Sequence, residues 1–179
     1  MDTLVVSLVS YKSNILEISK VLFFVKKMKN IKVKVCIFDN AKQSDLFKFC
    51  QKNKFNYFAS KNNVGFGNGH NYNIKKTIKT NPFYLILNPD IYLKSKDVNA
   101  CINLLKRKKS YGLLSPKLIN KDGSTQLIGR AIPSLFNFVL RFFFKYDNFS
   151  IKLHQKIDNQ KKLKFILNIP FIHGACYFI

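Results

Sequence analysis

Acidic residues are scarce in this chain, so the two that follow strand-like segments are the first candidates for chemistry. The sequence of 179 residues contains only nine acids. Asp90 comes directly after the apolar run 83–87 and Asn88-Pro89. A carboxylate at such a position can hold Mg²⁺ or Mn²⁺ beside a diphosphate and neutralise the charge of a leaving group. Asn-Pro-Asp is also ordinary turn chemistry, so position alone leaves a structural role open.

Asp39 and Asn40 form the second candidate, at the end of the alternating segment 32–38. An acid at the carboxyl end of a strand can accept a base N–H or a ribose hydroxyl. An Asx turn into the following helix explains the same two residues equally well.

The third candidate is the glycine-rich segment 63–71, with Gly65, Gly67 and Gly69 at alternate positions. Glycines let the backbone approach a ligand closely, and the free N–H groups of a following helix favour an anion. The spacing matches neither the dinucleotide fingerprint nor the P-loop, and a flexible turn is the alternative. The three histidines, His70, His154 and His173, show no metal-ligand spacing. His70 within this segment is interpreted as a structural hydrogen-bonding residue rather than a base.

The elements that must position these residues alternate between strand and helix. An apolar or alternating pattern predicts strands, and apolar residues at helical spacing predict helices. Residues 44–45 can cap the second helix, and Asp122-Gly123 signals a hairpin. The predicted strands are 4–9, 32–38, 56–59, 83–87 and 111–114, and the predicted helices are 15–28, 44–54, a segment from the 62–71 loop to about 80, and 96–109.

This order predicts an α/β fold, with a mostly parallel sheet covered by helices on both faces. Right-handed crossovers then place the carboxyl ends of the parallel strands at one edge. Tyr11, Asp39, Gly65 and Asp90 all follow such ends, so we expect them to share that edge.

The charge of the chain is extreme, with 31 basic and nine acidic residues and a formal net charge of +22. Such an excess can indicate nucleic acid, an anionic membrane surface or a phosphorylated substrate. However, only Arg107, Arg130 and Arg141 are arginines, the residue on which base readers and phosphate clamps depend. We therefore interpret most lysines as solvated surface and expect no nucleic-acid partner.

The cysteines and the hydropathy pattern indicate the compartment. No C-x-x-C pair is present, which argues against zinc, and Cys36 and Cys101 are predicted as buried thiols of a reducing compartment. The chain opens without a basic signal-peptide region, and no uncharged run reaches about 18 residues. A cytoplasmic protein is expected. The aromatic segment 135–146, beside the basic segment 152–164, fits either a core element or an interfacial helix on the inner face of the plasma membrane.

Taken together, these segments resemble family 2 glycosyltransferases, and among them the rhamnosyltransferase-like branch. The resemblance covers nearly the whole chain in order. It implies a GT-A fold with a Rossmann-like sheet, a nucleoside-diphosphate-sugar donor, and Mg²⁺ or Mn²⁺. It also implies a single domain over 1–179, with a nucleotide-binding part at 1–115 and an acceptor or membrane-side part at 116–179. The matching segments are 6–11, 37–40, 63–71, 87–91, 115–117 with 122–123, and 174–175.

The resemblance also implies roles for individual residues. Asp90 stands where many relatives carry a D-x-D and becomes the expected metal ligand, while Gly174 and Ala175 would lie beside the donor sugar or the acceptor. Relatives continue to an acidic segment that supplies the general base. This chain stops before that segment, so it looks truncated and its catalytic residue is unknown. The implied donor-nucleotide residues are Val9, Ser10, Tyr11, Asp39, Asn40, Asn63, Gly65, Phe66, Gly67, Asn71 and Asn88.

The function that follows is sugar transfer, with rhamnose as one candidate, from a dTDP- or UDP-sugar to a polysaccharide or lipid-linked saccharide. Cell-envelope polysaccharides such as O-antigen are the expected products. Two alternatives stay open at this point. One is an inactive remnant that binds nucleotide-sugar, and the other is a basic protein that binds nucleic acid or an anionic membrane.

Overall fold

The computed structural model describes residues 2–78, 82–126, 129–130, 171–172 and 174–179. The predictions for 135–146 and 152–164 therefore lie outside the described residues. The chain forms two compact units, one of residues 1–116 with 175–179 and one of residues 117–174. The first unit carries all the predicted strand ends.

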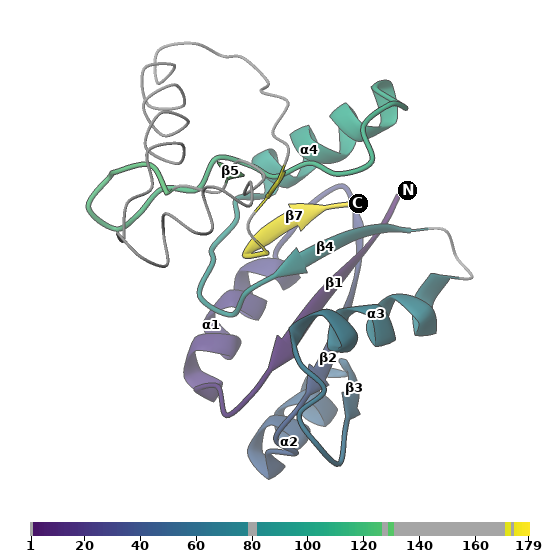
Figure 1. The fold of residues 1–179 in the computed structure, drawn as a ribbon, viewed down its shortest axis with the longest axis vertical. Coiled ribbons are helices and arrows are strands. Elements are labelled where there is room, and N and C mark those ends of the chain that lie inside the picture. The colour runs from purple at the N-terminus through teal and green to yellow at the C-terminus, as the bar shows by residue number, and fades with distance from the viewer. Residues whose placement is uncertain (1, 79–81, 127–128, 131–170, 173) are drawn as a thin grey trace, which may run out of the picture. The chain divides into compact units, whose positions relative to one another are not determined.

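A five-stranded sheet forms the centre of the first unit, in the order β3-β2-β1-β4-β7 (Figure 1). Four of its strands are parallel, as predicted: β1 (Thr3–Ser10), β2 (Lys32–Asp39), β3 (Asn56–Ala59) and β4 (Phe83–Leu87). The register pairs Ser10 of β1 with Asp39 of β2, so these two strands end side by side. The apolar strand patterns that predict this sheet are buried, with Leu4, Leu85 and Ile86 fully inaccessible.

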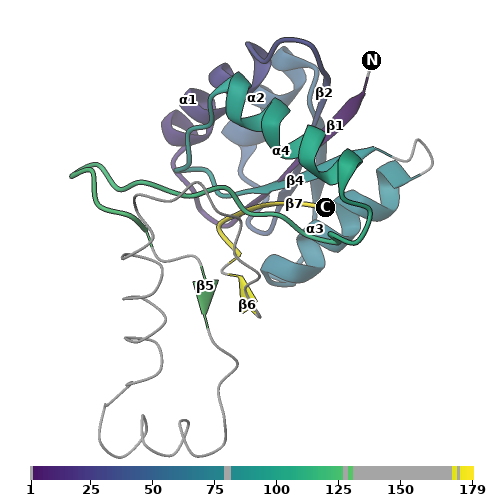
Figure 2. The same cartoon turned by 90° about the horizontal axis from the view of Figure 1, so that it is seen from above.

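Helices cover both faces of the sheet, as predicted. Figure 2 shows α3 on one face, and α1, α2 and α4 on the other. Helices α1, α2 and α4 turn apolar residues inward; in α1, for example, Ile18, Val21, Leu22 and Val25 are buried. The helices are α1 (Ile15–Lys26), α2 (Ser44–Asn53), α3 (Phe66–Thr77) and α4 (Ser95–Arg107).

The predicted strand over residues 111–114 is wrong. In its place β7 (Cys176–Phe178) occupies the edge beside β4 and runs antiparallel to it. Leu114 makes only an isolated bridge to Phe178, through two backbone hydrogen bonds of 2.7 and 2.9 Å. Pro116 has no N–H to continue a ladder, which is the physical reason the pairing stops there.

Two helix starts also differ from prediction. Ser44 and Asp45 lie inside α2, whose cap residue is Gln43, because the Asp39 carboxylate already accepts the Gln43 N–H. The third helix begins at Phe66, so Gly67 and Gly69 are helical rather than part of a loop. A side chain at Gly69 would collide with Val9 and Phe38, so close helix–sheet packing explains that glycine.

The described part of the second unit contains the predicted hairpin turn. Ile119 and Thr125 form an antiparallel bridge around Asp122-Gly123. Gly123 has a φ of +82°, and the Asp122 carboxylate accepts the Ser124 N–H at 2.9 Å. A short antiparallel pair joins β5 (Gly129–Arg130) and β6 (Phe171–Ile172) in the same unit.

The predictions of buried thiols are confirmed, since all four cysteines are free and buried. Burial raises the pKa of each thiol, which keeps the sulfur atoms in their unreactive protonated form. Within the described residues, no helix is long and apolar enough to cross a bilayer.

Candidate functional site

The carboxyl ends of the parallel strands meet at one edge of the sheet, where ligands of open α/β sheets bind. We divide this edge into two regions. The β1–β2 end comprises Ser10, Asp39, Asn40 and the segment 63–65. The β4 end comprises Asn88, Pro89, Asp90 and Ala175. Strand β4 pairs directly with β1, so the two regions follow neighbouring strands.

Asn40 joins three parts of the β1–β2 end. Its backbone N–H donates to the Ser10 carbonyl at 2.8 Å, which closes the end of β1 against β2. Its side-chain carbonyl accepts the Val64 N–H at 2.9 Å, and its side-chain amide donates to the Gly65 carbonyl at 3.4 Å. One asparagine therefore fixes the glycine segment against two strand ends.

The glycine segment turns into α3 at Gly65. Gly65 has a φ of +84°, in the region that favours glycine, and it is the cap residue of the helix. The Asn63 side chain accepts the Gly65 N–H at 2.9 Å. Residues 61–68 are exposed, and no side chain caps the first turn of α3. Its first N–H groups can therefore receive an anion.

Asp39 is fully buried and its carboxylate is heavily used within the protein. One oxygen accepts the Ala41 N–H at 2.8 Å, and the other accepts the Gln43 N–H at 2.7 Å and the Tyr57 hydroxyl at 2.9 Å. Burial and the bond to Asp39 raise the pKa of Tyr57, so that hydroxyl stays a donor. The Asx-turn interpretation is therefore confirmed, and contact with a nucleotide stays a prediction.

Asp90 contrasts with Asp39, because it is exposed at the β4 end. The Ile91 N–H donates to the Asn88 carbonyl at 3.3 Å, which forms the predicted turn. The Asn88 N–H donates to the Ala175 carbonyl at 2.9 Å. This bond brings the end of the chain to the strand end that carries Asp90. In the described part of the chain, no hydrogen bond or ion pair reaches the Asp90 carboxylate.

The other predicted site residues of the first unit fall at the same sheet edge or on α3. Val9 is half-buried with its side chain beside Gly69, Tyr11 is exposed just after β1, and Phe66 packs against His70 with ring centroids 4.3 Å apart. Gly67 and Asn71 are exposed on α3. Gly174 belongs to the second unit and Ala175 to the first.

Sequence reasoning missed a buried polar cluster beneath α3, made of Ser7, His70 and Asn73. The Ser7 hydroxyl lies 2.7 Å from His70 Nδ1 and accepts the Asn73 side-chain amide at 2.9 Å. Burial lowers the pKa of His70 to about 4, so its imidazole is neutral at neutral pH. The prediction that His70 is structural is confirmed. A serine inside an otherwise apolar strand was the signal that could have revealed its partners.

The residues of the edge are compatible with a divalent ion. Among the described residues no group of three His, Cys, Asp or Glu side chains could hold a metal by itself. Mg²⁺, however, often binds one or two carboxylates together with substrate phosphates. The exposed Asp90 carboxylate fits an ion that arrives with a diphosphate.

Comparison with known proteins agrees with the geometry. No protein-family profile matches the chain. Over 131 residues it is 26% identical to the low-salt glycan biosynthesis hexosyltransferase Agl10 of Haloferax volcanii, which covers 69% of this chain and 39% of that protein.

Solved structures of glycosyltransferases have the same fold. One is S. aureus TarS 1–349, with a TM-score of 0.54 and 20% identity over 75% of this chain and 39% of that chain. Another is the mannosyltransferase PcManGT from Pyrobaculum calidifontis in complex with GDP-Man and Mn²⁺, with a TM-score of 0.55 and 12% identity over 65% of this chain and 35% of that chain.

These likenesses confirm the predicted GT-A fold, and the sequence match confirms the resemblance to glycosyltransferases. The chain spans about two fifths of the length of the hexosyltransferase and of TarS 1–349.

Proposed function

We propose that this chain is the nucleotide-sugar-binding part of a glycosyltransferase that moves a hexose from a nucleoside diphosphate to a saccharide acceptor. The observation that carries the proposal is the arrangement of the carboxyl edge. Asn40 ties the ends of β1 and β2 to the glycine segment, and the exposed Asp90 follows the neighbouring strand. The similarity to a hexosyltransferase and to GT-A structures supports the same function.

Each region has a role in the proposal. The β1–β2 end holds the nucleoside, with the backbone of Val9, Ser10 and Tyr11 beside the base. The first turn of α3 offers its N–H groups to the diphosphate. Asp90 holds Mg²⁺ or Mn²⁺, and when bound that ion supplies positive charge against the leaving diphosphate. Asn88 and Ala175 position the sugar end of the donor.

The finer assignments extend this proposal. The donor is a dTDP-, UDP- or GDP-sugar, and rhamnose is one candidate sugar. The acceptor is a polysaccharide or a lipid-linked saccharide at the inner membrane face, in the biosynthesis of a cell-envelope polysaccharide. TarS has been solved with UDP-GlcNAc and PcManGT with GDP-Man, which supports a nucleotide-sugar donor without selecting among the nucleotides.

A thermal unfolding series tests the donor site. The purified chain is heated with dTDP, UDP or GDP, each with and without Mn²⁺. One nucleotide should raise the melting temperature, and only in the presence of Mn²⁺. At about 100 times the dissociation constant, a ligand stabilises the folded state by roughly 2.7 kcal/mol. A cooperative transition that no nucleotide shifts would contradict the proposal.

A donor-binding chain without turnover is the second candidate function. It would bind the nucleotide-sugar through the same strand ends and the first turn of α3. Proton removal from the acceptor hydroxyl needs a positioned base, and we assign none among the described residues. Nucleotide binding without transfer of radiolabelled sugar would select this candidate, and measurable transfer would reject it.

A further inference from the structure

The sheet has an open stretch on the side of β2 that faces away from β1. Strand β3 pairs only with the second half of β2, beginning with Asn56 opposite Cys36. Residues 32–35 of β2 pair with β1 on one side. On their other side, the described residues provide no strand. A stretch of this kind is a template for pairing with another chain.

The backbone hydrogen bonds of β2 show which of its backbone groups face this open side. The Lys32 N–H donates to the Asp2 carbonyl at 2.9 Å, so even-numbered residues of β2 point their backbone groups toward β1. On the opposite side, the Ser60 N–H donates to the Asp39 carbonyl at 3.3 Å. Since a parallel strand alternates its backbone direction residue by residue, the N–H groups of Val33 and Val35 point into the open side.

The connection from α2 explains why β3 starts so late. The helix ends at Asn53, and Lys54 takes a left-handed conformation with a φ of +58°. The Phe55 N–H donates back to the Cys50 carbonyl at 2.9 Å, and β3 begins at the next residue. Because of this tight turn, β3 begins opposite Cys36 and does not pair with the first half of β2.

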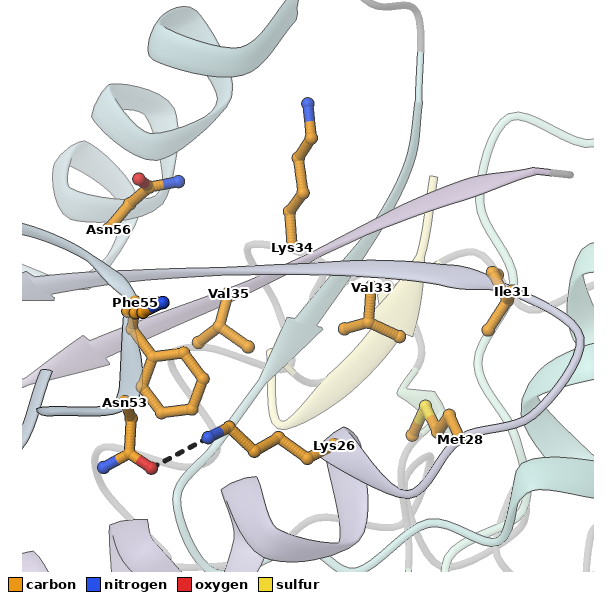
Figure 3. Close-up of a pocket in the computed structure, with 10 residues that line it drawn as sticks. Lys26, Met28, Ile31, Val33, Lys34, Val35, Asn53, Phe55 and Asn56 are labelled. Carbon is orange, nitrogen blue, oxygen red and sulfur yellow. Dashed lines mark hydrogen bonds between the residues drawn. The ribbon is translucent and has the colours of Figure 1, made fainter.

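A pocket of 330 Å³ is lined by this open stretch of β2 together with the end of α1 and residues 53–56 (Figure 3). Figure 3 shows Val33 and Val35 directed to the side of the strand where Lys26 lies, and Lys34 directed to the other. The Lys26 ammonium donates to the Asn53 side chain at 2.8 Å and lies 4.9 Å from the centre of the Phe55 ring. The lining is Lys26, Met28, Ile31, Val33, Lys34, Val35, Asn53, Lys54, Phe55 and Asn56, which includes three lysines and no acid.

The charge of the pocket decides what can occupy it. Lysines beside an open strand protect it against pairing with copies of the same chain, and a chain of +22 repels its own copies. The same lysines attract a strand of opposite charge. The apolar side chains at Ile31, Val33 and Phe55 accept alternate apolar residues of such a strand.

We propose that the open stretch 32–35 of β2 is a docking site for an acidic, extended segment of a partner protein, which adds as a strand beside β2, in line with β3. Backbone hydrogen bonds to Val33 and Val35 give affinity. Alternate apolar residues fill the pocket on the side of Val33 and Val35, and the alternating acids meet Lys34 on the opposite side of the strand. This mode is β-strand addition, and it uses a surface made from the start of β2 rather than the strand ends of the donor site.

Hydrogen exchange of the free chain tests the open stretch directly. The Val33 and Val35 amides should exchange much faster than the Lys32 and Lys34 amides, which β1 protects. A short peptide of alternating glutamate and valine should then protect Val33 and Val35. At about 100 times the dissociation constant, their exchange should slow by about 100-fold. Slow exchange of Val33 in the free chain would overturn the proposal.

Fluorescence anisotropy with the same peptide separates strand addition from simple charge attraction. The controls are a peptide of identical charge with N-methylated backbone, and a lysine–valine peptide. Both should fail to bind. Equal binding of the N-methylated peptide would overturn the proposal, because it cannot form the ladder.

A matched pair of charge reversals completes the test. Lys34→Glu should weaken peptide binding by about tenfold or more, as expected for losing an interfacial charge pair. Lys96→Glu, at an exposed position of α4, changes the net charge by the same amount. It should leave the dissociation constant of the peptide within twofold of the native value. Equal weakening by both variants would show attraction to net charge alone and overturn the site.

Discussion

Two aspartates lie at the same edge of the sheet, Asp39 at the end of β2 and Asp90 after β4, and their surroundings differ. Asp39 at the β1–β2 end is 0% exposed and accepts three hydrogen bonds from residues of its own unit. Asp90 at the β4 end is exposed, and its carboxylate receives no bond from the described residues. Their sequence contexts are alike, since each lies at or just after the end of a strand, beside a turn.

The difference indicates that Asp39 holds the structure of the site, whereas Asp90 is available to bind a ligand. A buried carboxylate whose oxygens already accept three donors holds its surroundings in place. An exposed carboxylate keeps its lone pairs for an incoming ion or ligand. We therefore expect the β1–β2 end to govern stability and the β4 end to govern metal-dependent binding.

Replacing Asp39 should have the largest effect on stability. Asp39→Ala removes the acceptor of the Ala41 and Gln43 N–H groups and of the Tyr57 hydroxyl. Hydrogen bonds to a charged group contribute about 1.5 kcal/mol or more each. The free energy of unfolding should fall by about 4 kcal/mol, measured by urea denaturation.

Asp45→Ala is the control for Asp39, because Asp45 is an exposed acid on the adjacent helix α2. Its loss should cost less than about 1 kcal/mol, the usual size of a charge interaction with a helix terminus. Similar losses for the two variants would remove the distinction drawn for Asp39.

Acid should destabilise the cluster beneath α3 through His70. Burial lowers the pKa of His70 to about 4 in the folded chain, whereas an unfolded histidine titrates near about 6.5. Between these values the unfolded chain binds a proton that the folded chain excludes. Stability is therefore complete above about pH 6.5 and falls by up to about 3 kcal/mol as the pH drops to 4.

The His70 contribution is isolated by comparison with His70→Gln. Urea denaturation at several pH values should show a slope between pH 6.5 and 4 in the native chain and a shallower one in the variant. Equal slopes would mean that His70 is protonated in the folded chain or that other groups dominate the acid response.

Asp90→Ala should give the opposite result to Asp39→Ala. Since the Asp90 side chain is exposed, the free energy of unfolding without ligand should change by less than about 0.5 kcal/mol. The Mn²⁺-dependent stabilisation by nucleotide should disappear, a loss of roughly 2.7 kcal/mol at about 100 times the native dissociation constant. Calorimetric melting with and without Mn²⁺ measures both effects.

Asp97→Ala provides the comparison for Asp90. Asp97 is an exposed acid in the first turn of α4. Nucleotide should stabilise this variant as it does the native chain. Retention of the Mn²⁺ effect in Asp90→Ala would show that the metal lies elsewhere.

The strands and helices that set this edge could be predicted because their patterns are local. Apolar runs such as 83–87 and the helical stripe of α1 depend on burial alone, and both elements formed close to the expected bounds. The prediction of a strand at 111–114 was wrong because several segments of a chain can compete to pair with the edge of a sheet. Strand β7, which lies far along the chain from β4, pairs with β4 instead.

The site was harder to read than the fold for a similar reason. Sequence position marked both Asp39 and Asp90, yet only three-dimensional contacts distinguish a satisfied carboxylate from an available one. Tyr57, which donates to Asp39, is 18 residues away in sequence. Ser7 and His70 are 63 residues apart, so their hydrogen bond follows from the packing of α3 on β1 and not from any spacing.

The smallest expected effect comes from a matched pair of glycines in α3. A Cβ at Gly69 would lie 2.8 Å from Val9 Cγ2 and 3.0 Å from Phe38 Cδ1, whereas a Cβ at Gly67 would meet nothing within 4 Å. Alanine improves helix propensity by up to about 1 kcal/mol at either position. At Gly69 the overpacking cost of roughly 1–3 kcal/mol exceeds that gain.

Gly69→Ala should therefore lose about 1 kcal/mol of unfolding free energy, and Gly67→Ala should gain about 0.5 kcal/mol, since first-turn positions realise only part of the propensity. Urea midpoints of the two variants measure the difference. Gly69 packs against the ends of β1 and β2, so Gly69→Ala should also weaken nucleotide binding. The dependence of that binding on Mn²⁺ should not change. A stabilised Gly69→Ala chain would mean that α3 can move away from these strand ends, and the β1–β2 end would then not be the rigid half of the edge.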